Sequence, residues 1–159
     1  MNFPILSSLI LLPVIGSLFL LFSKDKNSNT GKYVALFTSF VNFLISLYLW
    51  YQFDPTTSDF QFVEDREWLK GFINYKVGID GISILFIVLT ALITPLCIIS
   101  VNNTVKDRLR DFLIAILVME SLMIGVFCSL DLVIFYLFFE AGLIPMFLII
   151  GIWGGARRV

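Results

Sequence analysis

Five runs of about 20 mostly apolar residues constrain the fold of this chain more than any other feature. Each run is long enough to cross a hydrocarbon layer about 30 Å thick as an α-helix. Hydrophobic residues make up 58% of the sequence and charged residues only 14%, against roughly 45–50% and about 25% in soluble domains. We therefore predict an all-α, polytopic membrane helix bundle, a single membrane domain over 1–159, with spans at approximately 3–22, 33–51, 81–101, 112–128 and 132–153.

Basic residues between the runs predict how the bundle lies across the membrane. Most of them fall on one side, namely Lys24, Lys26, Lys32, Lys106, Arg108, Arg110, Arg157 and Arg158. Only Arg66, Lys70 and Lys76 fall on the other side, in the long segment 53–80. Because cytoplasmic loops carry an excess of Lys and Arg, we predict that the N-terminus lies outside and the C-terminus inside. Positive charges follow the first run and none precedes it, so we expect that run to be retained rather than cleaved as a signal peptide.

The chain contains no histidine, and its two cysteines stand alone in different apolar runs. Histidine is the commonest metal ligand and the usual haem ligand, and Cys97 and Cys128 lack the spacing of a zinc or iron–sulfur site. We expect both thiols to be buried structural groups, and we expect no metal or redox centre in this chain. No basic stripe is visible in the sequence that could bind nucleic acid.

The segment 53–80 is a long polar connection between the second and third runs. Its acidic residues are expected to form a solvated stretch without ligand spacing; they are Asp54, Asp59, Glu64, Asp65 and Glu67. Residues 72–77 alternate loosely between apolar and polar, which predicts a short strand or one arm of a hairpin. Asp80 lies in a turn between two glycines and is predicted to cap the third helix. We expect no chemistry from this segment.

Glu140 is the one acid in the otherwise uncharged run 132–156, and it is the strongest functional candidate in the sequence. A carboxyl at membrane depth costs roughly 2.5–3.5 kcal/mol on insertion scales, so it is a functional-site hypothesis by default. Each surrounding Leu, Ile, Val or Phe contributes about 0.3–0.6 kcal/mol in favour of insertion. The helix is therefore expected to insert together with its acid, which makes Glu140 a candidate proton relay.

Glu120 is a second acid within an apolar run, and a short turn joins that run to the one that carries Glu140. Counted from the turn at 1.5 Å per residue, both carboxyls are expected ~15 Å from the outer surface. A low dielectric disfavours the charged form and a second carboxylate disfavours it further, so such a pair would hold and release a proton near neutral pH. The sequence leaves open whether the two face each other. It also leaves open whether Glu120 is only a protonated group that hydrogen-bonds a neighbouring helix.

Pro145 follows Glu140 by little more than one turn and is predicted to bend the fifth helix. Its missing N–H leaves the carbonyl of Ala141 without its usual donor, next to the acid. A carbonyl freed in this way can hold water, which a proton path requires. Pro13 and Pro95 interrupt the first and third runs and are interpreted as packing features.

Three sequence motifs occur in register across residues 77–155. They are Val-Gly-Ile-Asp-Gly-Ile-Ser at 77–83, Met-Ile-Gly-Val-Phe-Cys at 123–128, and a stretch at 131–155 that includes Phe-Tyr-Leu-Phe-Phe-Glu-Ala-Gly-Leu-Ile-Pro. Together they closely resemble the antiporter-like, proton-pumping subunit of respiratory complex I that is called M in bacteria and chain 4 in mitochondria. The N-terminal third resembles this family only in its hydropathy.

The resemblance implies that Glu140 is the essential glutamate of the fifth helix, paired with a lysine on a later, broken helix. No lysine lies inside the five runs, so the chain is expected to be the N-terminal part of a larger subunit. Either it is a fragment of a longer gene product, or a split gene supplies the remainder, with that partner, as another chain. The resemblance further implies that NADH, FMN, iron–sulfur clusters and quinone bind to other subunits. Its implied partners are the other membrane subunits of complex I, the lipid bilayer and protons. The implied location is the bacterial plasma membrane or the mitochondrial inner membrane.

We therefore predict a membrane subunit of proton-translocating NADH:quinone oxidoreductase, in which Glu140 takes part in proton translocation while electrons pass through other subunits. Two alternatives stay open at this stage. One is a subunit of a multisubunit sodium/proton antiporter, which shares this architecture and a similar glutamate. The other is a non-catalytic membrane scaffold in which both acids are structural.

Overall fold

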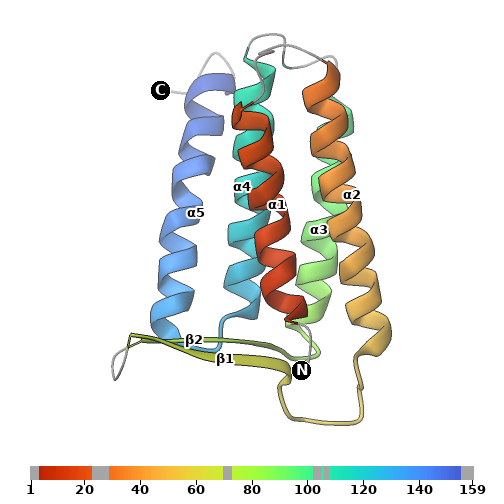
Figure 1. The fold of residues 1–159 in the computed structure, drawn as a ribbon, viewed down its shortest axis with the longest axis vertical. Helices are drawn as coiled ribbons and strands as arrows, with labels where there is room; N and C mark the ends of the chain where they lie inside the picture. The colour runs from red at the N-terminus through yellow and green to blue at the C-terminus, as the bar shows by residue number, and fades with distance from the viewer. Residues whose placement is uncertain (1–3, 23–28, 70–72, 102–104, 106–107, 155–159) are drawn as a thin grey trace.

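Five α-helices lie side by side in one bundle in the computed structural model, which describes residues 4–22, 29–69, 73–101, 105 and 108–154 (Figure 1). The helices are α1 (Ile5–Phe22), α2 (Asn29–Gln52), α3 (Ser83–Ser100), α4 (Leu109–Cys128) and α5 (Leu132–Trp153). All five are long and apolar enough to cross a membrane. The prediction of an all-α bundle with five spans is confirmed, and most boundaries agree to within a few residues.

The start of α1 and the end of α5 lie at opposite ends of the bundle (Figure 1), as an odd number of antiparallel spans requires. Which end faces the cytoplasm stays a prediction from the basic residues. Several of those residues lie outside the described part of the chain, namely Lys24, Lys26, Lys70, Lys106, Arg157 and Arg158.

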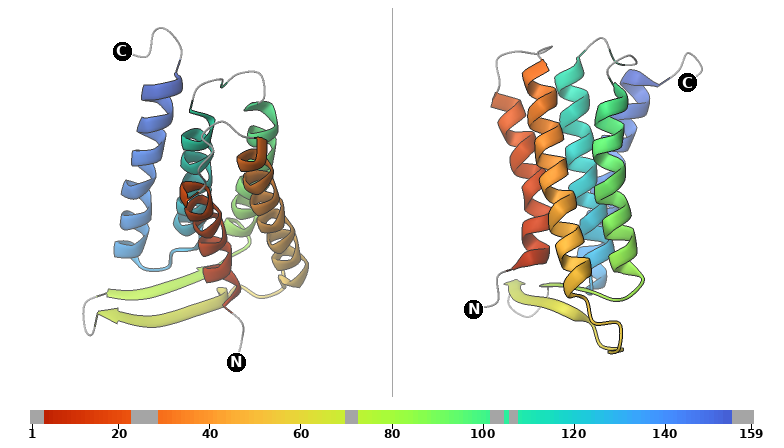
Figure 2. Two further views of the ribbon diagram at one scale, coloured as in Figure 1. Left: turned by 45° about the horizontal axis from the view of Figure 1, so that its top comes forward. Right: turned by 90° about the vertical axis from the view of Figure 1, so that its right-hand side faces the viewer.

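α4 lies at the centre of the bundle and packs against α1, α3 and α5 (Figure 2). Its span is 50% buried, because apolar or small residues recur every three or four positions along it. α5 is different, since it packs mainly on α4 and only 11% of its span is buried. Large apolar side chains such as Leu132 and Phe147 project from its outer face, which a membrane or another protein segment has to cover.

A β-hairpin lies across one end of the helices (Figure 1). It consists of the antiparallel strands β1 (Gln61–Leu69) and β2 (Ile73–Ile79). The predicted strand over 72–77 is confirmed from residue 73 onward, and Phe72 lies outside the described residues. Glu64, Asp65 and Glu67 belong to β1. The prediction of a solvated acidic stretch is confirmed for Asp65, which is exposed, but was wrong for Glu64, whose carboxylate is bonded to the start of α1. Acidic residues are poor strand formers, and the hairpin instead gains its stability from β2, which buries apolar side chains against the bundle.

The hairpin is bonded to two parts of the bundle. The Glu64 carboxylate accepts hydrogen bonds from the backbone N–H groups of Leu6 and Ser7, at 2.9 and 3.2 Å, and from the Ser7 hydroxyl. Glu64 therefore satisfies the free N–H groups at the start of α1. At the α4–α5 turn, the N–H of Leu130 donates to the carbonyl of Lys76 at 3.0 Å. Glu64 therefore has a structural role, which we did not predict from the sequence.

Asp80 accepts hydrogen bonds from the N–H groups of Ser83 and Ile82, at 2.7 and 3.2 Å, so its predicted role at the start of α3 is confirmed. The hydrogen bond from the Ser83 backbone is the main cause that holds the pKa of Asp80 below its ordinary value of 3.8. A carboxylate whose pKa is lower in the folded state stabilises the fold above its unfolded pKa and loses that effect on acidification.

We expect Asp80→Ala to lower the free energy of unfolding by about 1 kcal/mol at pH 7, the usual cost of losing a helix cap. The difference from the unmodified chain should shrink as the pH falls below 3.8 and the carboxyl of Asp80 is protonated. Thermal unfolding in detergent, followed by circular dichroism at neutral and acidic pH, measures both effects. Asp59→Ala, at an exposed position of the same segment, should leave stability unchanged. A difference that persists undiminished in acid would contradict the capping role.

Gly125 is the point of close approach between α4 and α5. A Cβ atom there would lie 2.7 Å from the ring of Phe138, below any normal contact. We expect Gly125→Val to lower the free energy of unfolding by about 1–3 kcal/mol, because the ring has to move out of a packed interface. Gly142→Val in α5 is the matched control, since no atom lies within 4 Å of a Cβ built there. Equal melting temperatures for the two variants would show that α4 and α5 do not pack closely at Gly125 and Phe138.

Candidate functional site

A set of buried polar side chains lies inside the bundle, on the four helices that enclose its interior. The members are Ser17, Thr38, Ser39, Asn42, Ser46, Thr94, Glu120 and Ser121. Five of the Ser and Thr hydroxyls donate to a backbone carbonyl three or four residues earlier in their own helix, which satisfies them locally. The Ser121 hydroxyl reaches across to the carbonyl of Ile10 in α1 at 2.5 Å. Asn42 and Glu120 are left as the two members with large polar groups.

Glu120 and Asn42 form a hydrogen-bonded pair in the centre of the bundle. The Nδ2 of Asn42 in α2 donates to Oε1 of Glu120 in α4 at 2.9 Å. The two side chains are 0% and 2% exposed. Along α4, Glu120 lies between Leu117 and Ile124, which belong to separate apolar clusters of the interior. A carboxyl is therefore held at one defined place within an apolar environment.

Two oxygens of this pair have no hydrogen-bond partner, Oε2 of Glu120 and Oδ1 of Asn42. A carboxylate and an amide oxygen are both acceptors, so each lacks a donor. Leaving a buried acceptor without a donor costs about 1–3 kcal/mol. A proton on the carboxyl, or a water that donates to these oxygens, supplies what is missing. The Glu120–Asn42 pair is therefore suited to hold a proton or to bind a water.

A partly open cavity of about 220 Å³ lies between α3 and α4, and Glu120 is among the residues that line it. Its lining includes Thr90, Thr94 and Cys97 of α3 together with Glu120. A water requires only about 10–15 Å³ and two or more polar partners, so the cavity has room for several.

Cys97 is exposed and unpaired, so the prediction of a buried thiol was wrong for Cys97, because α3 turns that position outward. Cys128 is buried and free as predicted.

Glu140 lies on the exposed side of α5 and not in the interior. An open hollow beside it is lined by apolar residues of the same helix, including Ile144 and Phe147. The Tyr136 hydroxyl, one turn earlier, interacts with the Glu140 carboxyl. Glu120 instead turns toward α2, so the structure does not bring the two predicted acids together. The two acids therefore do not face each other, a point that the sequence left open, although both lie within helices long enough to span a membrane.

Pro145 is one of the two buried residues of α5, and the helix continues through it from Leu132 to Trp153. Proline has no N–H, so the carbonyl of Ala141 lacks its usual helical donor as predicted. Whether that carbonyl holds water next to Glu140 stays a prediction.

Asn42 is the residue of the site that sequence reading missed. A signal for it is present, because Thr38, Asn42 and Ser46 recur at intervals of four in an otherwise apolar run. Polar residues at this spacing share one face of a helix, and a membrane span with a polar face turns it toward other helices. The stripe predicts a helix–helix contact, although it does not identify Glu120 as the partner.

The fold and these carboxyls define a class: polytopic α-helical membrane proteins that carry ionisable side chains inside their spans. Residues 6–128 match the family described as NADH-ubiquinone oxidoreductase chain 4, amino terminus. The match covers most of the sequence, so the chain belongs to this family. The resemblance read from residues 77–155 is confirmed, and the match also extends into the N-terminal third, where only hydropathy suggested it.

Relatives from bacteria and plants share nearly the whole chain. NADH-quinone oxidoreductase subunit M of Rhodobacter capsulatus is 58% identical over 135 residues, 85% of this chain and 25% of that protein. NADH-ubiquinone oxidoreductase chain 4 of Marchantia polymorpha is 47% identical over 154 residues, 96% of this chain and 31% of that protein. Subunit M of Rickettsia prowazekii is 43% identical over 163 residues, 100% of this chain and 33% of that protein. The chain thus spans a quarter to a third of the length of these relatives.

A solved structure has a similar fold. It is the membrane-bound sulfane sulfur reductase, an archaeal respiratory membrane complex, one chain of which matches with a TM-score of 0.71. The match covers 89% of this chain and 22% of that chain at 18% identity. At this level of identity the likeness concerns the fold alone.

Proposed function

We propose that this chain is part of a membrane subunit of a proton-translocating NADH:quinone oxidoreductase and that Glu140 carries protons within it. The observation that carries the proposal is one carboxyl, Glu120 or Glu140, in the uncharged middle of each of two adjacent spans. Ionisable groups at this depth are rare and mark proton or ion pathways. Membership in the chain 4 family and the names of the relatives support the same function. The membrane is the bacterial plasma membrane or the mitochondrial inner membrane.

The exposed position of Glu140 indicates what has to lie against α5 in the whole protein. Intramembrane acids face a protein interior or a water-filled space and pair with a cation, because exposure to hydrocarbon is costly. We infer that the remainder of the same subunit covers this face and places a lysine next to Glu140. A nearby cation favours the carboxylate, and withdrawal of the cation favours the protonated acid. Movement of that lysine would therefore load and unload a proton at Glu140.

Glu120 is the second proton carrier in this proposal. Its carboxyl lacks a donor at Oε2, and its side chain is among those that line the cavity between α3 and α4, where water that reaches the carboxyl would exchange protons with it. Pro145 contributes the freed carbonyl of Ala141, which orients water near Glu140. Because Glu120 faces α2 and Glu140 faces away from the bundle, protons pass between them through water and not by direct contact.

Electron transfer takes place on other subunits of the parent complex, which bind NADH, FMN, iron–sulfur clusters and quinone. The partners of this chain are the other membrane subunits and the lipid bilayer. The free energy of quinone reduction reaches the bundle as a conformational or electrostatic change, whose local effect is the movement of charge next to Glu140.

The proposal is tested by proton uptake into inverted membrane vesicles that contain the whole complex, with Glu140 replaced by Gln. NADH-driven uptake should collapse while the complex still assembles. A sodium/proton antiporter would instead exchange sodium for protons in vesicles without NADH. Loss of assembly in this variant would favour the scaffold alternative.

A further inference from the structure

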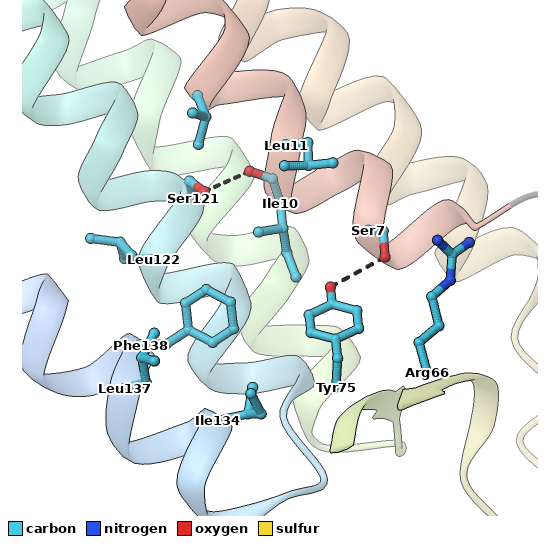
Figure 3. A pocket seen from close by; sticks show the side chains of 11 residues that line it. Ser7, Ile10, Leu11, Arg66, Tyr75, Ser121, Leu122, Ile134, Leu137 and Phe138 are labelled. Atoms are coloured by element: carbon cyan, nitrogen blue, oxygen red, sulfur yellow. Dashed lines mark hydrogen bonds between the residues drawn. The ribbon is translucent and has the colours of Figure 1, made fainter. Parts of the chain in front are cut away.

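A groove runs between α1 and α5 on the surface of α4, and the proposed function does not use it (Figure 3). We refer to it as the α1–α5 groove; it encloses about 600 Å³. Its walls are Ile10, Leu11 and Val14 of α1 and Ile134, Leu137 and Phe138 of α5, and its floor is Ser121 and Leu122 of α4. The only hydroxyl of the floor, on Ser121, is engaged by the carbonyl of Ile10. The space inside is therefore apolar.

The end of the groove next to the hairpin is polar. Arg66 of β1 and Tyr75 of β2 rise from the hairpin toward it, opposite Ser7 at the start of α1 (Figure 3). The hydroxyls of Ser7 and Tyr75 lie 3.2 Å apart. The groove thus combines an apolar interior at membrane depth with hydroxyls and a guanidinium at the membrane surface.

One cationic side chain, Arg66, lines this end of the groove. Glu64 lies two residues before Arg66, but its carboxylate is engaged by the N-terminus of α1. Lys76 and Asp65, on the two strands of the hairpin, pair with each other at 3.8 Å. Arg66 is exposed and lines the groove, and its planar guanidinium binds phosphate in a bidentate manner.

The position of the hairpin favours a lipid as the occupant. Both strands lie across the ends of the helices (Figure 1), so a further transmembrane helix in the groove would have to end at the hairpin. A lipid uses both parts of the groove, because its chain lies within the bilayer and its headgroup rests at the surface, next to Arg66. From Ser7 to Val14 the wall of α1 extends ~10 Å at 1.5 Å per residue, which accommodates a large part of one acyl chain.

We propose that the α1–α5 groove binds an anionic phospholipid, with its phosphate on Arg66 and one acyl chain between α1 and α5. The phosphate contacts the guanidinium of Arg66, next to the hydroxyls of Ser7 and Tyr75, which are engaged by Glu64 and by each other. The acyl chain covers Leu11, which is 54% exposed, and Leu137, which is 45% exposed, in the chain without lipid. This site does not depend on any proton-transfer role of Glu120 or Glu140.

The test is lipid retention by the full chain, purified in mild detergent and measured by native mass spectrometry. Phosphatidylglycerol and phosphatidylcholine with the same acyl chains are added in turn. The unmodified chain should retain one phosphatidylglycerol in preference to phosphatidylcholine. Arg66→Gln should lower phosphatidylglycerol retention about fivefold, the factor that one cationic residue contributes at an anionic lipid surface. Lys76→Gln, which removes a cation paired elsewhere on the hairpin, should retain the lipid as before.

The apolar part of the site is tested separately. Leu11→Trp places a large ring into the groove and should lower retention of both lipids. Leu18→Trp, two turns further along α1 at a similarly exposed position outside the groove, should not. A photoactivatable acyl chain on phosphatidylglycerol should label peptides from α1 and α5. Equal retention by the Arg66 variant and the unmodified chain, or labelling elsewhere, would overturn the proposal; a preference for quinone over both phospholipids would overturn it as well.

Discussion

Replacing Glu140 with Gln is expected to reduce NADH-driven proton uptake at least tenfold in vesicles that contain the whole complex. Gln has nearly the size of Glu and keeps hydrogen-bonding atoms, but it cannot release a proton. The side chain is exposed on α5, so the substitution removes no packing from the bundle and assembly should be normal. Proton uptake is followed with a pH-sensitive dye, NADH oxidation by absorbance, and assembly by native gel electrophoresis of the same membranes.

Two control variants sharpen this experiment. Glu140→Asp keeps a titratable group and should retain a substantial part of the proton uptake. Leu143→Ala changes an apolar neighbour that lines the same hollow, and uptake should stay close to normal. Proton uptake by the Gln variant at the rate of the unmodified complex would remove Glu140 from the mechanism. Failure of the complex to assemble would make Glu140 a structural contact of the surface that covers α5.

The five spans could be predicted from the sequence because hydropathy over a window of 18 or more residues is a local property. The rotation of each span about its own axis could not. α5 is apolar on all sides, so its sequence has no periodicity that reveals which face is inside. Glu120 and Glu140 both lie within helices long enough to span a membrane, as predicted, but only the packing of α4 on α2 shows that Glu120 is enclosed and Glu140 is not.

The hairpin illustrates a second limit of sequence reading. Glu64 looks like one member of a solvated acidic stretch, because its partner, the N-terminus of α1, lies 57 residues away in sequence. Asp80 acts on residues within three positions, and its role was predicted. Local capping is therefore readable from sequence, whereas capping by a distant segment depends on the tertiary fold.

Glu120 allows a test that separates proton transfer from structure. In Glu120→Gln the new carboxamide still accepts from Nδ2 of Asn42, and its NH2 group replaces Oε2, a buried acceptor that has no donor in this structure. The free energy of unfolding should therefore be unchanged or slightly higher. Proton uptake should fall at least tenfold, because the amide cannot carry a proton. Thermal unfolding and vesicle uptake, measured for the same variant, report the two effects separately.

Apolar substitutions of the pair supply the structural reference. Glu120→Leu leaves the Asn42 amide buried without a partner and should lower the free energy of unfolding by about 1–3 kcal/mol. In the double variant Asn42→Leu with Glu120→Leu, no polar group is left unpaired, so much of that loss should be recovered. Normal proton uptake by Glu120→Gln, together with a destabilised Glu120→Leu, would identify the pair as a helix–helix hydrogen bond and leave Glu140 as the proton carrier of this chain. Lost uptake at unchanged stability would identify Glu120 as the second carrier, because a purely structural hydrogen bond survives the exchange of a carboxyl for an amide.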